Sequence, residues 1–233
     1  MIVAAAMIPH PPLLLPGITG SPDAQVETIT RFATAAVAAT VDSGIDDIIG
    51  IGGAATTAQW PAGVPATAGY LGRSASGNRL PLSISVITSL LPERRGWPLQ
   101  LRSIAFDATA AQAREFGSTL ADGPGRTALV VAGDGSARRT ANAPGFVDVR
   151  AVDYDRAVER ALAEADTEAL ARLDPVQARE LLVAGRAAWQ VLAGACHGQR
   201  FESHIDYTGD PFGVWYVVAR WRNRCPSPML TRI

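Results

Sequence analysis

The hydrophobic positions of the chain form short unbroken runs, separated by longer stretches in which apolar residues recur at helical spacing. Ile2–Ile8, Ile48–Ile51 and Thr127–Ala132 are rich in small and β-branched residues, and prolines stop the first run. Such runs are typical of strands that are buried on both faces of a parallel sheet. The stretches between them favour helices. The pattern therefore predicts an α/β fold.

The other predicted elements continue this alternation. Ser21-Pro22-Asp23 supplies an N-cap, a first-turn proline and an acid at the positive end of a helix that extends to about Val41. A Pro/Gly/Ala/Thr-rich stretch up to about Gly77 predicts a loop. Further helices are predicted at Pro81–Leu91, Ala108–Leu120, Tyr154–Ala165 and Pro175–Gly194, and further strands at Leu99–Phe106 and Phe212–Trp221. We expect one α/β domain over residues 1–233, with a mostly parallel central sheet flanked by helices.

Charge and composition narrow the classes of partner and compartment. The chain has 21 basic and 22 acidic residues, so no broad field favours nucleic acid or an anionic membrane, and we expect neither partner. Cys196 and Cys225 are too far apart in sequence to suggest a disulfide framework or a thiolate metal site. The apolar start lacks a basic segment and contains four prolines, unlike a signal peptide. These features predict a soluble, cytoplasmic protein.

Histidine and carboxylate residues offer two candidate sites. His10 lies among prolines directly after the first strand, where a rigid loop would hold its imidazole still, although a lone histidine cannot complete a metal site. His197, Glu202 and His204 are the residue types of a non-haem iron site. In an extended segment, however, only Glu202 and His204 would share a face.

Two glycine-containing segments follow predicted strands. Gly50, Gly52 and Ala55 spell G-x-G-x-x-A, but no helix is predicted to follow and no acid lies between residues 66 and 77, which disfavours dinucleotide binding. Gly133-Asp134-Gly135-Ser136 lacks the nucleophile-elbow pattern and favours a turn.

The pair Arg138 and Arg139 follows that turn directly. Two guanidinium groups there could bind a carboxylate at the mouth of the sheet, although neighbouring surface arginines are more often solvated.

Taken in chain order, these segments resemble the class III, LigB-type extradiol dioxygenase superfamily, including its Memo-like branch. Pro9–Pro16 is similar to the family's P-H-P-P-L-L-like loop, so that His10 matches its first iron-binding histidine. Ala132–Thr140 is similar to the family's S-G-D-L-S-H signature, and Asp206–Val214 resembles its Y-x-G-P-F-G-like segment. The resemblance extends from end to end and implies a LigB-like fold.

The same resemblance implies that most catalytic positions have changed. The family holds Fe(II) with two histidines and one carboxylate, and another histidine transfers protons. Here Gly53 or Ala54 stands at the second histidine, Ala137 at the proton-transfer histidine and Val183 at the carboxylate. We therefore expect no cofactor, with His10 as a vestigial ligand. A shift of the alignment by a few residues would make Glu180 a displaced carboxylate.

Three functional hypotheses follow. The first is an iron-free pseudoenzyme with a small-ligand pocket at the carboxyl ends of the strands, lined by His10, Gly53, Asp134, Ser136 and Arg138. The second is a non-catalytic structural subunit that pairs with an active paralogue, and a homo-oligomer without such a partner would count against it. The third is an active ring-cleavage enzyme with a metal site rebuilt from His10 and one of three other residues, Glu180, Glu202 or His204. This last hypothesis requires those side chains to converge.

Overall fold

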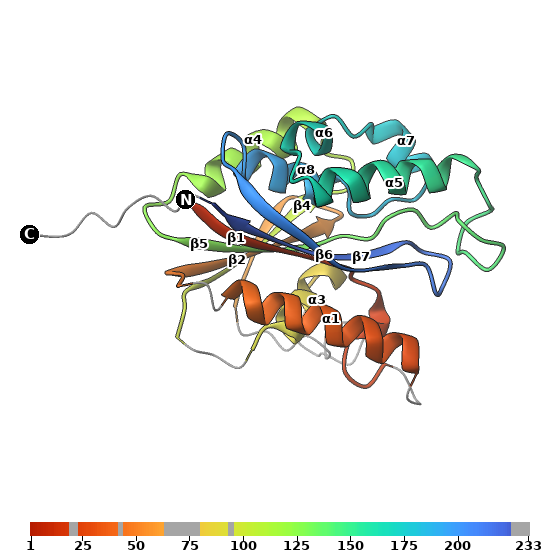
Figure 1. The fold of residues 1–233 in the computed structure, drawn as a ribbon, viewed down its shortest axis with the longest axis horizontal. Helices are drawn as coiled ribbons and strands as arrows, with labels where there is room; N and C mark the ends of the chain where they lie inside the picture. The colour runs from red at the N-terminus through yellow and green to blue at the C-terminus, as the bar shows by residue number, and fades with distance from the viewer. Residues whose placement is uncertain (19–22, 42–43, 63–79, 93–95, 225–233) are drawn as a thin grey trace, which may run out of the picture.

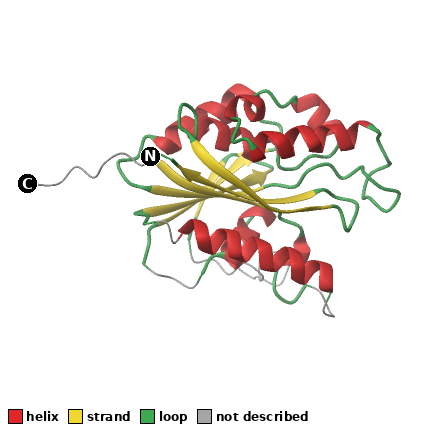
Figure 2. Cartoon of the chain, in the orientation of Figure 1, coloured by secondary structure: helices red, strands yellow, loops and turns green. Residues whose placement is uncertain are grey.

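A mixed seven-stranded sheet forms the centre of a single α/β domain. The computed structural model describes residues 1–18, 23–41, 44–62, 80–92 and 96–224 (Figure 1). The predicted helix start at Ser21-Pro22, most of the predicted loop up to Gly77 and Cys225 lie outside these residues. Helices cover both faces of the sheet (Figure 2). The predicted α/β class is confirmed.

The sheet is parallel in its centre and antiparallel at both edges. Its order is β3-β4-β2-β5-β1-β7-β6. The strands are β1 (Ile2–Ile8), β2 (Asp47–Ala54), β3 (Ala58–Trp60), β4 (Leu99–Ala105), β5 (Thr127–Ala132), β6 (Phe201–Gly209) and β7 (Tyr216–Asn223). Only β4, β2, β5 and β1 run parallel. The prediction of a mostly parallel sheet is therefore only partly right, because β3 pairs antiparallel with β4, β7 with β1, and β6 with β7.

The helices form two layers. They are the 3₁₀ helix η1 (Pro12–Leu14) and the α-helices α1 (Ala24–Val41), α3 (Leu82–Leu90), α4 (Ala110–Ala121), α5 (Arg150–Ala163), α6 (Thr167–Ala171), α7 (Pro175–Glu180) and α8 (Arg186–Ala195). In Figure 1, η1, α1 and α3 lie below the sheet and the other helices above it. The core has one apolar cluster on each side. Among the described residues, no helix is both long and apolar enough to cross a membrane.

The alternation of side chains along β2 divides its residues between the two clusters. Ile49 and Ile51 pack with the layer that contains α8, whereas Ile48 packs with the layer of α1 and α3. The helices α4 and α8 approach closely because Gly117 and Gly194 face the other helix's backbone, where a Cβ atom would collide with a carbonyl oxygen. This contact fixes α8, and with it the segment that precedes α8.

The predicted helix at Pro175–Gly194 is wrong in one respect: it is two helices. The chain leaves α7 after Glu180, and Leu182 adopts a left-handed conformation with φ of 58° before α8 begins at Arg186. The sequence also failed to predict β3, β6 and α6. The edge strand β6 is mostly polar, its residues after Phe201 are exposed or partly buried, and it contains no apolar run, so its sequence lacked the signal used for the other strands.

Candidate functional site

His10 and Asp134 meet where β1 and β5 end side by side. The backbone N–H of His10 donates to Asp134 Oδ1 at 2.7 Å, and the N–H of Gly133 donates to the carbonyl of Ile8 at 2.9 Å. His10 is 5% exposed, and its Nδ1 lies 3.5 Å from the same Asp134 oxygen without making a hydrogen bond. The prolines around His10 and the turn at Asp134 thus bring the two residues together at the carboxyl edge of the sheet.

The environment of Asp134 favours its protonated form. Burial raises the pKa of this carboxyl group above its ordinary value, and both the charge and the backbone N–H of His10 act in the opposite direction. The carbonyl oxygen of Asp134 also accepts the N–H of Gly185 at 2.8 Å. Asp134 is therefore bonded to two other segments of the chain, through its side chain and through its backbone.

Ser136 belongs to a buried structural network. It is fully buried, and both its backbone N–H and its hydroxyl donate to Asp155 on α5, at 2.9 and 2.5 Å. Arg139 lies 3.4 Å from the Asp155 carboxylate and 2.9 Å from that of Asp210. Burial raises the pKa of Asp155, whereas the Ser136 hydrogen bonds and Arg139 lower it. These contacts anchor the turn after β5, as expected for turn chemistry, and leave the hydroxyl no access to solvent.

The segment between α7 and α8 covers the ends of β2 and β5. A Cβ atom added to Gly53 would overlap the Phe106 ring and lie 3.1 Å from the carbonyl oxygen of Ala184. A Cβ atom on Gly133 would lie 2.6 Å from Gly185 Cα. In α/β folds this edge of the sheet commonly binds ligands. Here protein atoms occupy the space above Gly53 and Gly133.

A cavity of about 380 Å³ opens beside the segment between α7 and α8, beyond the end of β4. Its walls are mainly apolar and come from the turn after β4, from α7 and from the segment after it. The lining residues are Phe106, Asp107, Pro175, Val176, Ala178, Arg179, Leu182, Val183, Ala184 and Arg186. The size lies within the range of small-molecule sites. Gly53 borders this cavity indirectly, through the Phe106 ring and Ala184.

Two arginines bring positive charge to the cavity. Arg186, 3% exposed, donates to the carbonyls of Phe106 and Ala108, at 2.5 Å each, and to the Gln190 side chain at 2.9 Å. Burial lowers its pKa, while Tyr154 and Asp107 raise it. Arg179 is exposed on α7 and makes no ion pair or side-chain hydrogen bond with a described residue.

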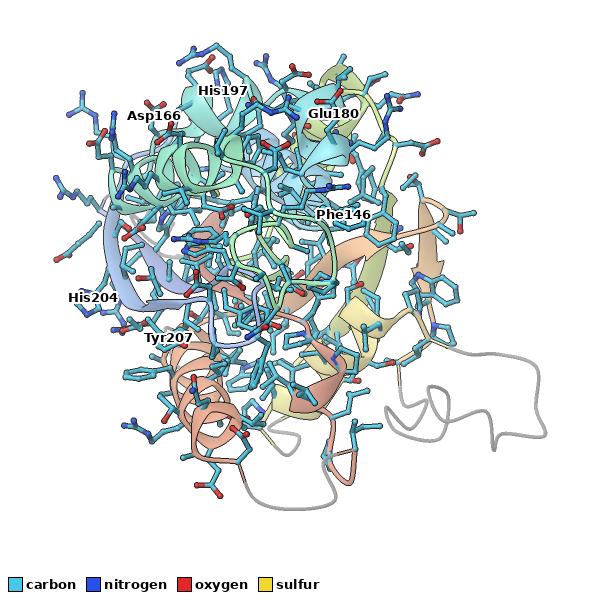
Figure 3. The ribbon with its side chains drawn as sticks, turned by 90° about the vertical axis from the view of Figure 1, so that its right-hand side faces the viewer. Phe146, Asp166, Glu180, His197, His204 and Tyr207 are labelled. Carbon is cyan, nitrogen blue, oxygen red and sulfur yellow. The ribbon has the colours of Figure 1, made fainter. Side chains whose placement is uncertain are left out.

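The other predicted site residues lie apart from one another. Glu180 on α7 forms an ion pair with Arg150 at 2.8 Å, and His204 on β6 lies 3.4 Å from Asp206. Figure 3 shows His204 and Glu180 on opposite sides of the molecule. Among the residues that the structure describes, no three His, Cys, Asp or Glu side chains are placed to hold a metal ion. The convergence that a rebuilt metal site requires is thus not found.

Glu202 and His204 do share one face of β6, as expected for an extended segment. Both line a second hollow of about 330 Å³ between α1 and the edge of the sheet, together with Arg220. His197 instead lies in the turn after α8, 3.2 Å from Glu168. The three residues therefore belong to two separate places.

Arg138 lies at the start of the loop that leads to α5. It is partly buried and donates to the carbonyl of Phe146 at 3.3 Å. The structure thus brings His10, Asp134 and Ser136 to one edge of the sheet, and the segment between α7 and α8 covers Gly53. That these residues and Arg138 bind a ligand stays a prediction. Sequence reasoning missed Phe106, Arg179 and Arg186. For Arg186 a signal was available in the sequence, because this arginine follows Gly185 directly in a mainly apolar segment.

The fold occurs in a solved structure. The crystal structure of uncharacterized protein JW3007 from Escherichia coli K12 is similar to this chain with a TM-score of 0.56 and 14% sequence identity, covering 94% of this chain and 99% of that one. At this identity the likeness shows the shared fold alone. No protein-family model and no curated protein matches the sequence.

Proposed function

We propose that the chain is an iron-free, LigB-like pseudoenzyme that binds a small ligand in the cavity beside Phe106. One observation carries the proposal: the resemblance implies that Gly53 or Ala54 stands at the family's second histidine, and a side chain at Gly53 would collide with the Phe106 ring and approach the Ala184 carbonyl. The remaining donor set does not fit ferrous iron, which takes two imidazoles and a carboxylate with open positions for substrate and dioxygen.

The other changed positions support the same proposal. Ala137 and Val183 stand where the resemblance implies a proton-transfer histidine and a carboxylate, and both are buried. Neither side chain can bind a metal ion or transfer a proton. His10 has Asp134 as its nearest acidic neighbour, and Asp134 already accepts the backbone N–H of His10. The proposal therefore places the ligand in the cavity beside Phe106, whereas His10 is buried beside Asp134.

Metal analysis and a ring-cleavage assay test the proposal. The full chain would be expressed with added iron, purified without chelators and assayed for iron content and for oxygen uptake with catechols. We expect substoichiometric iron and no ring cleavage. One iron per chain together with cleavage of a catechol would refute the iron-free reading.

An exposed apolar segment favours a second candidate, a non-catalytic subunit of a paralogous enzyme. Phe146, labelled in Figure 3, is 88% exposed, and Val149 at the start of α5 is 87% exposed. Large apolar side chains with this exposure are common at protein interfaces. Co-purification of the tagged chain from its native cells would separate the candidates. A paralogous partner recovered at equal stoichiometry favours the subunit, whereas a monomer or a homo-oligomer argues against it.

A further inference from the structure

We propose that the cavity beside Phe106 takes a small organic anion, a monocarboxylate with an apolar body, whose charged group lies between Arg186 and Arg179. This inference deepens the proposed function and rests on its claim that the cavity is a binding site. It names the chemical class of the ligand from the charges and the apolar surface that the cavity presents.

Arg186 carries the electrostatic part of the argument. Three of its N–H groups donate to neutral acceptors, the carbonyls of Phe106 and Ala108 and the Gln190 side chain. No carboxylate of the described residues lies within ion-pair distance of it. Buried charges in proteins are normally paired, because removing an unpaired ion from water is costly. A guanidinium group also has five donors in a planar fork that suits a carboxylate. An anion in the cavity would supply the missing partner.

Arg179 places a second unpaired cation at the rim. The neighbouring carboxylate on α7, Glu180, is already held by Arg150, so it does not neutralise Arg179. The cavity lining therefore has two guanidinium groups against one carboxylate, that of the exposed Asp107. The excess of one positive charge matches a singly charged anion and disfavours a cation.

The walls of the cavity fit the apolar part of such a ligand. Phe106, Val176 and Leu182 leave 48%, 52% and 45% of their surface exposed. Covering these side chains with the apolar body of a ligand would stabilise the complex, because it removes apolar surface from water. Leu182 also holds a left-handed backbone conformation, which is strained for an L residue and is often found at functional sites. A strained leucine is thus kept at the rim, with its side chain on the cavity.

Titration calorimetry with three eight-carbon probes tests the inference. Octanoate, 1-octanol and octylamine share an apolar body and differ in the charge of the head group. We expect saturable binding of octanoate, binding of 1-octanol that is at least about tenfold weaker, and no binding of octylamine. A charged hydrogen bond is worth about 1.5–3 kcal/mol, which corresponds to tenfold or more in affinity.

Two exposed arginines, Arg179 in the cavity lining and Arg172 outside it, give a test variant and its matched control. Arg179→Gln should weaken octanoate about tenfold and leave 1-octanol unchanged, whereas Arg172→Gln, an exposed arginine outside the cavity, should change neither. Arg186→Gln is not used alone, because Arg186 also holds the turn after β4.

Three results would overturn the inference: no saturable octanoate binding, equal affinities for octanoate and 1-octanol, or equal losses in the two arginine variants. These outcomes are distinct from failure of the proposed function. That failure would appear as bound iron and ring cleavage, whatever the calorimetry shows.

Discussion

Two regions at the same edge of the sheet differ in how they use their polar groups. At the ends of β1 and β5, carboxylates accept hydrogen bonds from within the chain, and the segment after α7 fills the space above. Beyond β4, the lining of a cavity includes exposed apolar side chains and the Arg186 guanidinium, which has no carboxylate of a described residue as its ion-pair partner. The first region therefore has the properties of a scaffold, and the second those of a binding site. The proline-rich motif around His10 thus lies in the scaffold region.

Removing the Asp155 carboxylate should have the largest effect on the scaffold region. Asp155→Ala leaves the Ser136 N–H without its acceptor and takes from Arg139 one of its two carboxylate neighbours. Breaking a buried pair from one side costs about 3–5 kcal/mol. We expect a loss of this size in the free energy of unfolding, measured by urea denaturation at pH 7.

Asp153→Ala is the matched control on the same helix. Its carboxylate is 85% exposed and lies 3.9 Å from Arg156, so we expect a change below about 0.5 kcal/mol. Equal losses in the two variants would mean that the Ser136–Asp155 network does not support the turn after β5. Octanoate binding by folded Asp155→Ala protein should match that of the wild type, because Asp155 does not line the cavity.

Elements with a strong local signal could be predicted from the sequence. The strands β1 and β5 match their predicted bounds, because each is an unbroken apolar run that stops at prolines or at a turn. The break between α7 and α8 could not be predicted in this way. Leu182 carries no breaker signal, and Gly185 was included within the predicted helix. Contacts with Asp134 and Gly133 hold the segment, and these are tertiary contacts.

The candidate site divides in the same way. Its scaffold part was predictable because His10 and Asp134 each follow a strand of a parallel sheet, and the carboxyl ends of such strands share an edge. The cavity was not, because Phe106 is far in sequence from Val176 and Arg186 and no motif joins the three residues. Their common place depends on how α7 and α8 pack over the end of β4.

The charge of Asp134 provides a smaller test of the scaffold. Since burial raises its pKa, its contribution to stability is fully present below the unfolded pKa of about 4 and is lost as the pH rises through the folded value. Asp134→Asn keeps an oxygen to accept the His10 N–H and removes the charge. As the pH rises from about 4 to 7, we expect the free energy of unfolding of the variant to increase relative to that of the wild type. The expected change is about 1–2 kcal/mol, the cost of an imperfectly paired buried group.

Asp148→Asn should show the opposite sign in the same urea series. Hydrogen bonds from Arg150 lower the pKa of Asp148 to about 2, so its contribution is present above the unfolded pKa and is lost as the pH falls through the folded one. The variant should be less stable than the wild type at neutral pH, and the difference should shrink on acidification. An Asp134→Asn variant that is destabilised equally at pH 4 and pH 7 would contradict the assigned cost of its charge.

The smallest effect on stability is expected in the cavity region, at Leu182. Leu182→Gly removes about 1–2 kcal/mol of left-handed strain, offset by about 0.5–1 kcal/mol of chain entropy in the unfolded state. The free energy of unfolding should therefore stay within about 1 kcal/mol of the wild type, on the favourable side. Octanoate binding should weaken about fivefold, because an apolar wall of the cavity is lost.

Ala165→Gly is the control that separates strain from binding. Ala165 is the other non-glycine residue with positive φ in the described part of the chain, at 51°, and it lies after α5, away from the cavity lining. The two variants should change stability in the same direction, and only Leu182→Gly should change octanoate affinity. If Leu182→Gly binds octanoate as the wild type does, the leucine is not part of a binding wall. The contrast between scaffold and cavity would then rest on the arginines alone.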